Sequence, residues 1–81
     1  MSEKYKIISP IPGVFYRKTS PEKDEFVNVG QEVNSGDVIG MVEIMKTYYE
    51  ITAEKSGIVE EISPNEAIVD AGQELAVLHI K

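Results

Sequence analysis

The residue best placed for chemistry is Lys46, which lies near the middle of the sequence between two segments typical of β strands. One segment ends near Val42 and the other begins near Tyr49, so a hairpin between them would put Met45 and Lys46 at its tip. A lysine there would be fully exposed, with its amine free of partners. Position alone favours an ordinary solvated lysine, so the flanking sequence has to distinguish it from a functional lysine.

The composition excludes most other kinds of chemistry. The 81 residues contain no Cys and a single His, His79, which excludes disulfides, thiolate metal sites and multi-histidine metal sites. We interpret the acidic residues Glu43, Glu50, Glu60 and Glu61 as solvated charge on strands, and His79 as an ordinary strand histidine. Because no acid, base and nucleophile cluster together in the sequence, an independent enzyme is the least favoured class.

The charge and the hydropathy pattern bear on partners and location. The net charge is −6 and the eight Lys and Arg residues are scattered, so we expect neither nucleic acid nor a membrane surface as a partner. No apolar stretch is long enough to span a bilayer as a helix. Residues 1–5 lack the apolar segment of a signal peptide, so we expect a cytoplasmic protein.

Short runs rich in β-branched residues are the expected structural elements. The predicted strands cover residues 6–9, 13–16, 37–42, 49–52, 57–62 and 75–80. Turn-forming residues separate these runs and no segment keeps a helical period over a useful length, so the sequence predicts an all-β sandwich or barrel. Gly36 and Gly72 lie in turns that precede strands, where we expect a positive φ.

The two halves of the sequence repeat each other weakly. Residues 33–42 resemble residues 69–78 at an offset of 36, whereas Gly13 and Gly57, which each precede a β run, are 44 residues apart. The first half therefore holds eight extra residues (44 − 36), which must lie in the mostly polar segment 16–29. We interpret this as a protruding loop inserted into a two-fold repeated sandwich, and a chance match of two glycine turns is the alternative.

The sequence around Lys46 resembles the attachment motif of the biotinyl and lipoyl domain family. Glu43-Ile44-Met45-Lys46 is similar to the Glu-Ala-Met-Lys-Met motif of biotinyl domains, and the resemblance covers about residues 7–80. Three longer segments are similar to the same family: residues 9–17, 29–37 and 51–59. The inserted loop within residues 16–29 is similar to the thumb of the biotin carboxyl carrier proteins of bacterial acetyl-CoA carboxylases.

Two positions depart from the family motif. Ile44 stands where biotinyl domains usually have Ala, and Thr47 stands where they usually have Met. Lipoyl domains usually place Asp before the lysine, so the Met45 found here favours biotin over lipoate. A lipoyl-type acyl carrier remains one alternative. Ile44 and Thr47 support another, a protein-binding module that keeps the fold without the modification.

The resemblance implies a fold and a reaction. The implied fold is a flattened β-barrel or sandwich of two four-stranded antiparallel sheets with pseudo-two-fold symmetry, as a single domain over residues 1–81. A biotin protein ligase would join biotin to Lys46 through an amide, with Glu43 and Met45 as the recognition motif. The modified lysine would swing carboxybiotin between a biotin carboxylase subunit and a carboxyltransferase subunit. The implied complex is an acetyl-CoA carboxylase of fatty acid biosynthesis, or a related acyl-CoA carboxylase, in which this chain is a non-catalytic carrier.

The thumb-like loop adds a second set of candidate residues. Thr19, Ser20 and Pro21 are candidate contacts to the biotin, because the resemblance implies a thumb that approaches the cofactor. A simple surface loop is the alternative for these residues. We expect the domain to be monomeric.

Overall fold

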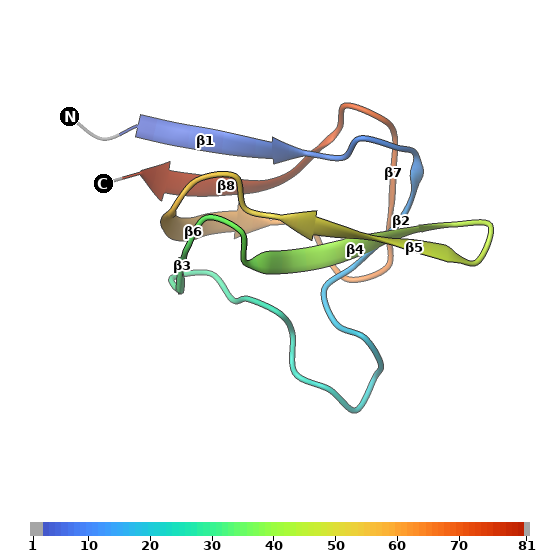
Figure 1. Ribbon diagram of the computed structural model, residues 1–81. Coiled ribbons are helices and arrows are strands. Elements are labelled where there is room, and N and C mark those ends of the chain that lie inside the picture. Colours follow the sequence, from blue (N-terminus) through green and yellow to red (C-terminus); the bar gives the residue numbers. More distant parts are fainter. Residues whose placement is uncertain (1–2, 81) are drawn as a thin grey trace.

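The protein is built entirely from β strands and turns over residues 3–80, which are the residues that the computed structural model describes (Figure 1). The strands are β1 (Glu3–Ile8), β2 (Gly13–Tyr16), β3 (Glu32–Val33), β4 (Val38–Ile44), β5 (Thr47–Thr52), β6 (Gly57–Ile62), β7 (Ala67–Val69) and β8 (Glu74–Ile80). They form two four-stranded antiparallel sheets with the orders β1-β8-β6-β3 and β5-β4-β2-β7. This confirms the predicted architecture. Within residues 3–80 no helix is long and apolar enough to cross a membrane.

Each of the six strand segments predicted from sequence overlaps a strand of the structure, namely β1, β2, β4, β5, β6 or β8. The two strands that were not predicted, β3 and β7, have two and three residues and are too short to show an alternating pattern. Their position depends on partners distant in sequence, because β3 pairs with β6 and β7 pairs with β2. β3 forms one edge of the first sheet and β7 one edge of the second.

The sequence repeat corresponds to a structural two-fold. β5 starts 44 residues after β1 (47 − 3) and β8 starts 36 residues after β4 (74 − 38), which reproduces both offsets. Each sheet becomes the other when every strand is replaced by its counterpart in the other half. Equivalent turns also close with equivalent bonds, since Gly36 N–H donates to Ala53 and Gly72 N–H donates to Ser9, each at 2.7 Å. Both glycines have positive φ, 96° and 86°, as predicted.

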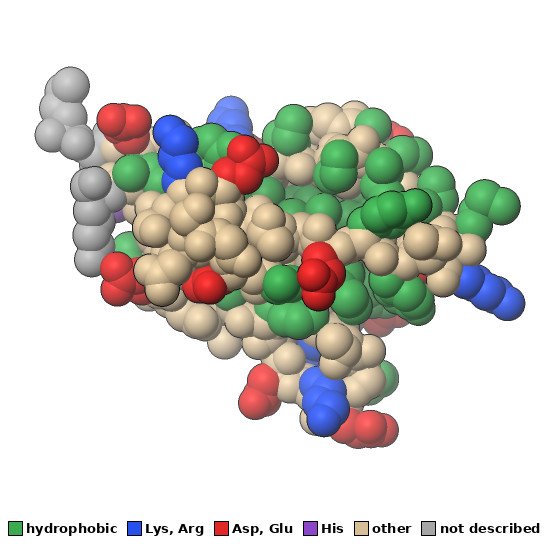
Figure 2. All heavy atoms as spheres, viewed as in Figure 1, with side chains coloured by type: hydrophobic (Ala, Val, Ile, Leu, Met, Phe, Trp, Pro, Cys, Tyr) green, Lys and Arg blue, Asp and Glu red, His purple; other side chains and the backbone are tan. Residues whose placement is uncertain are grey.

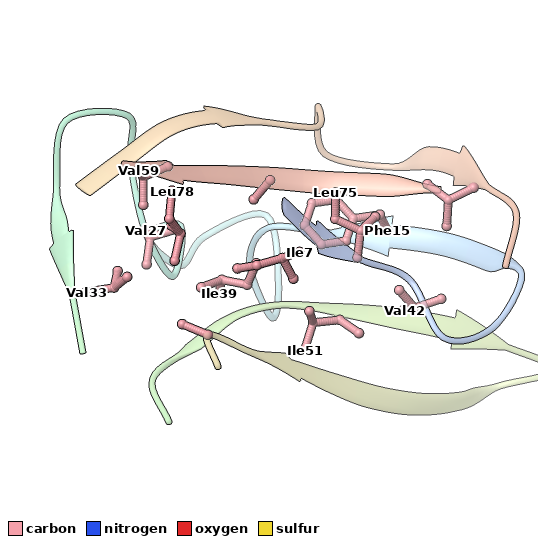
Figure 3. Packing of buried hydrophobic residues seen from close by; sticks show 13 residues of the cluster. Ile7, Phe15, Val27, Val33, Ile39, Val42, Ile51, Val59, Leu75 and Leu78 are labelled. Atoms are coloured by element: carbon pink, nitrogen blue, oxygen red, sulfur yellow. The ribbon is translucent and has the colours of Figure 1, made fainter. Parts of the chain in front are cut away.

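The core lies between the two sheets (Figure 3). Phe15 on β2 and Ile39 on β4 meet Leu75 and Leu78 on β8, and all four side chains are at most 1% exposed. Each such side chain contributes roughly 1.5–3 kcal/mol by leaving water. Because β2 and β4 both supply core residues, their relative position is fixed, and with it the position of the hairpin that follows β4.

The connection from β2 to β3 is the long loop of the fold. It spans residues 17–31, whereas its counterpart between β6 and β7 spans residues 63–66, and Figure 1 shows it protruding from the sandwich. The Arg17 side chain closes its base, with an ion pair to Glu25 at 3.2 Å and a hydrogen bond to the Val27 carbonyl at 3.1 Å. Val27 is 3% exposed, so the returning end of the loop is anchored in the core.

A charged cluster on the sheet that contains β1, β6 and β8 leads to a prediction about stability at low pH. Lys4 lies 3.1 Å from one carboxylate oxygen of Glu60, and Nδ1 of His79 lies 3.0 Å from the other. The hydrogen bond from Lys4 is the main cause that lowers the pKa of Glu60 below its ordinary value of 4.5. A lowered pKa in the folded state gives stability that is present above pH 4.5 and is lost as the pH falls through the lowered pKa.

We therefore expect Glu60→Gln to lose less stability than the wild type when the pH is lowered below 4.5. Urea unfolding midpoints measured over a pH series check this. Glu61→Gln, an exposed neighbour on the same strand, is the control and should follow the wild type. If the unfolding midpoints of wild type and Glu60→Gln fall equally as the pH is lowered, the role of this cluster is contradicted.

Candidate functional site

Lys46 lies at the tip of the β4–β5 hairpin, as the sequence predicted. The last strand pair is Ile44 and Thr47, so Met45 and Lys46 alone form the turn. Their φ angles are 50° and 65°. Two residues with positive φ between paired strands are the signature of a type I′ turn. In Figure 1 the hairpin projects at the end of the sandwich opposite the first and last described strand residues.

The residues of this turn are not those that stabilise it best. Type I′ turns favour Asn-Gly, because other side chains cost about 1–2 kcal/mol per residue in the left-handed region. Met45 and Lys46 both have positive φ, so each adds this cost to the turn. Strain held in a turn points to a requirement other than stability at those positions.

Glu43 connects the turn to the neighbouring strand. Its Oε2 accepts a hydrogen bond from the Lys46 backbone N–H at 3.2 Å, and its Oε1 accepts one from the Tyr16 hydroxyl at 3.2 Å. The carboxylate thus supports the strained turn from below. The sequence had suggested Glu43 as solvated charge and as part of a recognition motif. The first interpretation is wrong, because both carboxylate oxygens accept hydrogen bonds within the protein.

The surface around the turn is apolar and open. Met45 is 90% exposed, and Tyr48 and Tyr49 on β5 are both substantially exposed. Figure 2 shows hydrophobic side chains gathered over this end of the molecule. Within residues 3–80 the Lys46 amine makes no ion pair, so it is available to a partner that approaches the tip.

A shallow cavity of about 270 Å³ lies at the base of the long loop. Its lining residues are Tyr16, Lys18, Thr19, Ser20, Pro21, Asn65 and Glu66. The structure therefore brings the three candidate loop residues, Thr19, Ser20 and Pro21, to one cavity. In the described part of the chain no hydrogen bond joins them to the hairpin. Tyr16 is the residue shared by the cavity and the contacts of Glu43.

Sequence reasoning missed Tyr16 and Asn65. Tyr16 reads as an ordinary strand aromatic, and Asn65 lies in the opposite half of the chain. The Asn65 side chain accepts a hydrogen bond from the Arg17 N–H at 2.8 Å, which fixes the start of the loop. The sequence held no local signal for this contact, because Arg17 and Asn65 are 48 residues apart.

The Tyr16 hydroxyl is a donor over the ordinary pH range. Burial raises its pKa above the ordinary value of 10.0, and the hydrogen bond to Glu43 raises it further. The proton that the hydroxyl donates to Glu43 is therefore present below pH 10.0 and is lost only as the pH rises through the raised pKa.

Other kinds of site find no support in residues 3–80. No group of three or more His, Cys, Asp or Glu side chains there is placed to hold a metal ion. Glu60 is paired with Lys4 and His79, so the interpretation of Glu60 as solvated charge is wrong. The hairpin and the neighbouring cavity are therefore the candidate functional site.

A family model described as "Biotin-requiring enzyme", that of the biotin/lipoyl family, matches residues 5–78. The chain belongs to the biotin/lipoyl family. This agrees with the resemblance seen in the sequence around Lys46. The two four-stranded sheets agree with the fold that this resemblance implied.

Curated relatives of this biotin/lipoyl domain share a name. The chain is 48% identical over 58 residues to the biotin carboxyl carrier protein of acetyl-CoA carboxylase from Haemophilus influenzae, and the match covers 72% of this chain and 37% of that protein. It is 46% identical over 65 residues to the protein of the same name from Pseudomonas aeruginosa, covering 80% of this chain and 38% of that protein. The chain thus spans less than two fifths of the length of these relatives.

Solved structures show the same fold within larger chains. The biotin/lipoyl domain matches the Kluyveromyces lactis urea carboxylase with a TM-score of 0.77 and 31% identity, covering 94% of this chain and 6% of that one. It also matches an aspartoacylase family protein from Mesorhizobium loti with a TM-score of 0.72 and 28% identity, covering 93% and 22%. The fold therefore recurs in proteins with different names, so the residues of the hairpin have to carry the functional argument.

The strain in the hairpin of this biotin/lipoyl domain can be measured. Replacing Met45 by Asn and Lys46 by Gly together should raise the free energy of unfolding by about 2 kcal/mol, because both new residues tolerate positive φ. Glu66→Gly is the matched control, since Glu66 is the remaining non-glycine residue with positive φ, 66°, among those described. It should gain about 1 kcal/mol. Urea unfolding of the three proteins checks both values, and no gain in the double variant would show that the turn is unstrained.

Proposed function

We propose that the protein is a non-catalytic biotin carboxyl carrier that holds biotin in amide linkage on Lys46. The observation that carries the proposal is the exposed lysine on a strained two-residue turn, in a chain of the biotin/lipoyl family. The names of its curated relatives support acetyl-CoA carboxylase as the complex that it serves. The proposed partners are a biotin protein ligase, a biotin carboxylase subunit and a carboxyltransferase subunit.

The residues of the hairpin fit an attached biotin. Lys46 is exposed at the tip of the hairpin and has no ionic partner within residues 3–80, so a ligase can reach its amine. Amide formation takes a proton from the lysine nitrogen, so the ligase has to supply the group that accepts it. When bound, biotin supplies a ring that takes up and releases a carboxyl group. The four-carbon stem of Lys46 gives the tether its reach, and the rigid sandwich sets its origin.

We further propose that the loop within residues 16–29 is a thumb and that residues 1–81 form one carrier domain. Thr19, Ser20 and Pro21 line one cavity beside Tyr16, which supports them as contacts to the biotin. Glu43 and Met45 are proposed as the part of the turn that the ligase recognises. Glu43 fixes the backbone of Lys46 through its hydrogen bond, and Met45 offers an exposed apolar side chain next to it.

The test is the intact mass of the protein after incubation with biotin, ATP and a biotin protein ligase. We expect a gain of one biotinyl group per chain. A parallel incubation with lipoate and a lipoate ligase distinguishes the two cofactors of the family. A lipoyl gain without a biotinyl gain would overturn the choice of biotin. No gain in either incubation would overturn the carrier function and favour an unmodified module of the same fold.

A further inference from the structure

Tyr16 lies where the hairpin and the long loop meet. Its hydroxyl donates to Glu43 at 3.2 Å, and its ring lies 6.2 Å from the ring of Tyr48 at an angle of 50°. The same side chain lines the cavity formed by residues 18–21. One half-buried residue thus contacts the strand before the turn, the strand after it and the base of the loop.

We propose that Tyr16 is a positioning residue for Lys46, which holds the Glu43 carboxylate under the turn and couples the turn to the base of the 17–31 loop. The expected effect of Tyr16 on biotin attachment rests on the proposed function. The expected ordering of the turn by Tyr16 does not depend on that function.

The argument starts from the two oxygens of the Glu43 carboxylate. Oε1 accepts from the Tyr16 hydroxyl and Oε2 accepts from the Lys46 N–H, so the two bonds together fix the rotation of the carboxylate. Without the hydroxyl the carboxylate is free to turn toward water, and the bond to Lys46 weakens. Because both turn residues are held at positive φ, a weaker bond lets the turn populate other conformations.

The two-fold relation between the halves supports a structural role for the contact between Tyr16 and Glu43. The counterpart of Tyr16 is Glu60 (16 + 44) and the counterpart of Glu43 is His79 (43 + 36), and these residues contact each other at 3.0 Å. The fold therefore uses the same two positions in both halves to tie neighbouring strands through their side chains. In the first half alone, this tie lies directly below the turn that carries Lys46.

Tyr16→Phe tests the proposal by removing a single oxygen atom. We expect the Lys46 backbone N–H to exchange with water about threefold to tenfold faster, from the loss of one hydrogen bond. In the ligase reaction we expect KM for the carrier to rise by a similar factor with kcat little changed, because a smaller fraction of the carrier presents the ordered turn. The measurements are water-exchange NMR of the Lys46 N–H and steady-state kinetics of biotin incorporation.

Tyr5→Phe is the matched control. Tyr5 also donates its hydroxyl to a glutamate, Glu54, at 2.9 Å, but this pair takes no part in the Glu43 hydrogen bonds and does not line the cavity beside Tyr16. The control should leave both the Lys46 exchange rate and KM unchanged. Equal effects of the two substitutions, or no effect of Tyr16→Phe, would overturn the proposal.

A double-mutant cycle separates positioning from a general structural role. If Tyr16 acts through Glu43, Tyr16→Phe should change the Lys46 exchange rate by less than about twofold in a Glu43→Ala background. Independent, multiplying effects would overturn the proposal. If the wild type takes up no biotin, the proposed function fails, and the exchange measurements still decide whether Tyr16 orders the turn.

Discussion

Lys46→Arg is expected to abolish biotin attachment while leaving the fold unchanged. Arginine keeps the positive charge and a long stem, but its guanidinium remains protonated and offers no amine that can form the amide. Lys46 is exposed at the turn and packs against no core side chain, so the free energy of unfolding should stay within about 0.5 kcal/mol of the wild type. The measurement is the intact mass after incubation with the ligase, beside a urea unfolding curve.

The other lysines provide controls for this experiment. Lys18→Arg changes a cavity residue of the long loop, and Lys55→Arg changes a residue that lies over the Tyr5 ring at 5.3 Å. Both variants should still gain one biotinyl group. Biotin uptake by Lys46→Arg would show that another lysine is the attachment site. It would contradict the proposal that the strained turn presents that lysine.

Gly13→Ala is expected to cost about 3 kcal/mol or more of the free energy of unfolding, which is the upper range for overpacking. A Cβ atom at Gly13 would overlap the carbonyl oxygen of Glu43 and lie 2.8 Å from Cγ1 of Val42. The backbone oxygen cannot move without opening the β2–β4 pair, in which Val14 faces Glu43. Because the same shift displaces Glu43, biotin incorporation should slow as well.

Gly72→Ala separates steric overlap from backbone conformation. Gly72 has a φ of 86° and no atom within 4 Å of its ideal Cβ position, so only the backbone preference is lost there. We expect a cost of about 1 kcal/mol from that preference alone. Urea unfolding of both variants gives the comparison, and similar losses would contradict the close approach of β2 to β4.

The sequence predicts a large share of this fold because its strongest signals are local. Alternating β-branched runs and glycine turns predict six strands, and the two offsets of 36 and 44 residues predict a repeat with an inserted loop. Gly36 and Gly72 illustrate the reason, since the turn itself demands a residue that tolerates positive φ. Strands β3 and β7 are too short for such a signal, and pairing with distant partners determines them.

The contacts below the turn could not be predicted in this way. Tyr16 and Glu43 are 27 residues apart, and they face the same side of the sheet only because Val14 pairs with Glu43. A shift of one residue in that register would turn the two side chains to opposite faces. Lys46 was predictable as a tip residue, whereas its φ of 65° was not, because neither Met45 nor Lys46 is a typical type I′ residue.

The two-fold has a consequence for the connectivity of the chain. Ile44 and Thr47 flank the hairpin turn, and their counterparts in the other half, Ile80 and Glu3, are paired in the same way between β8 and β1. A two-residue link from Ile80 to Glu3 would therefore close the strands into a ring, and a cut in any exposed turn would reopen it. A ring of this kind has no privileged first strand. Apart from the loop at residues 17–31, the two halves of the ring have the same strand order. A lysine in the second link would therefore give one sandwich with two carrier arms at opposite ends.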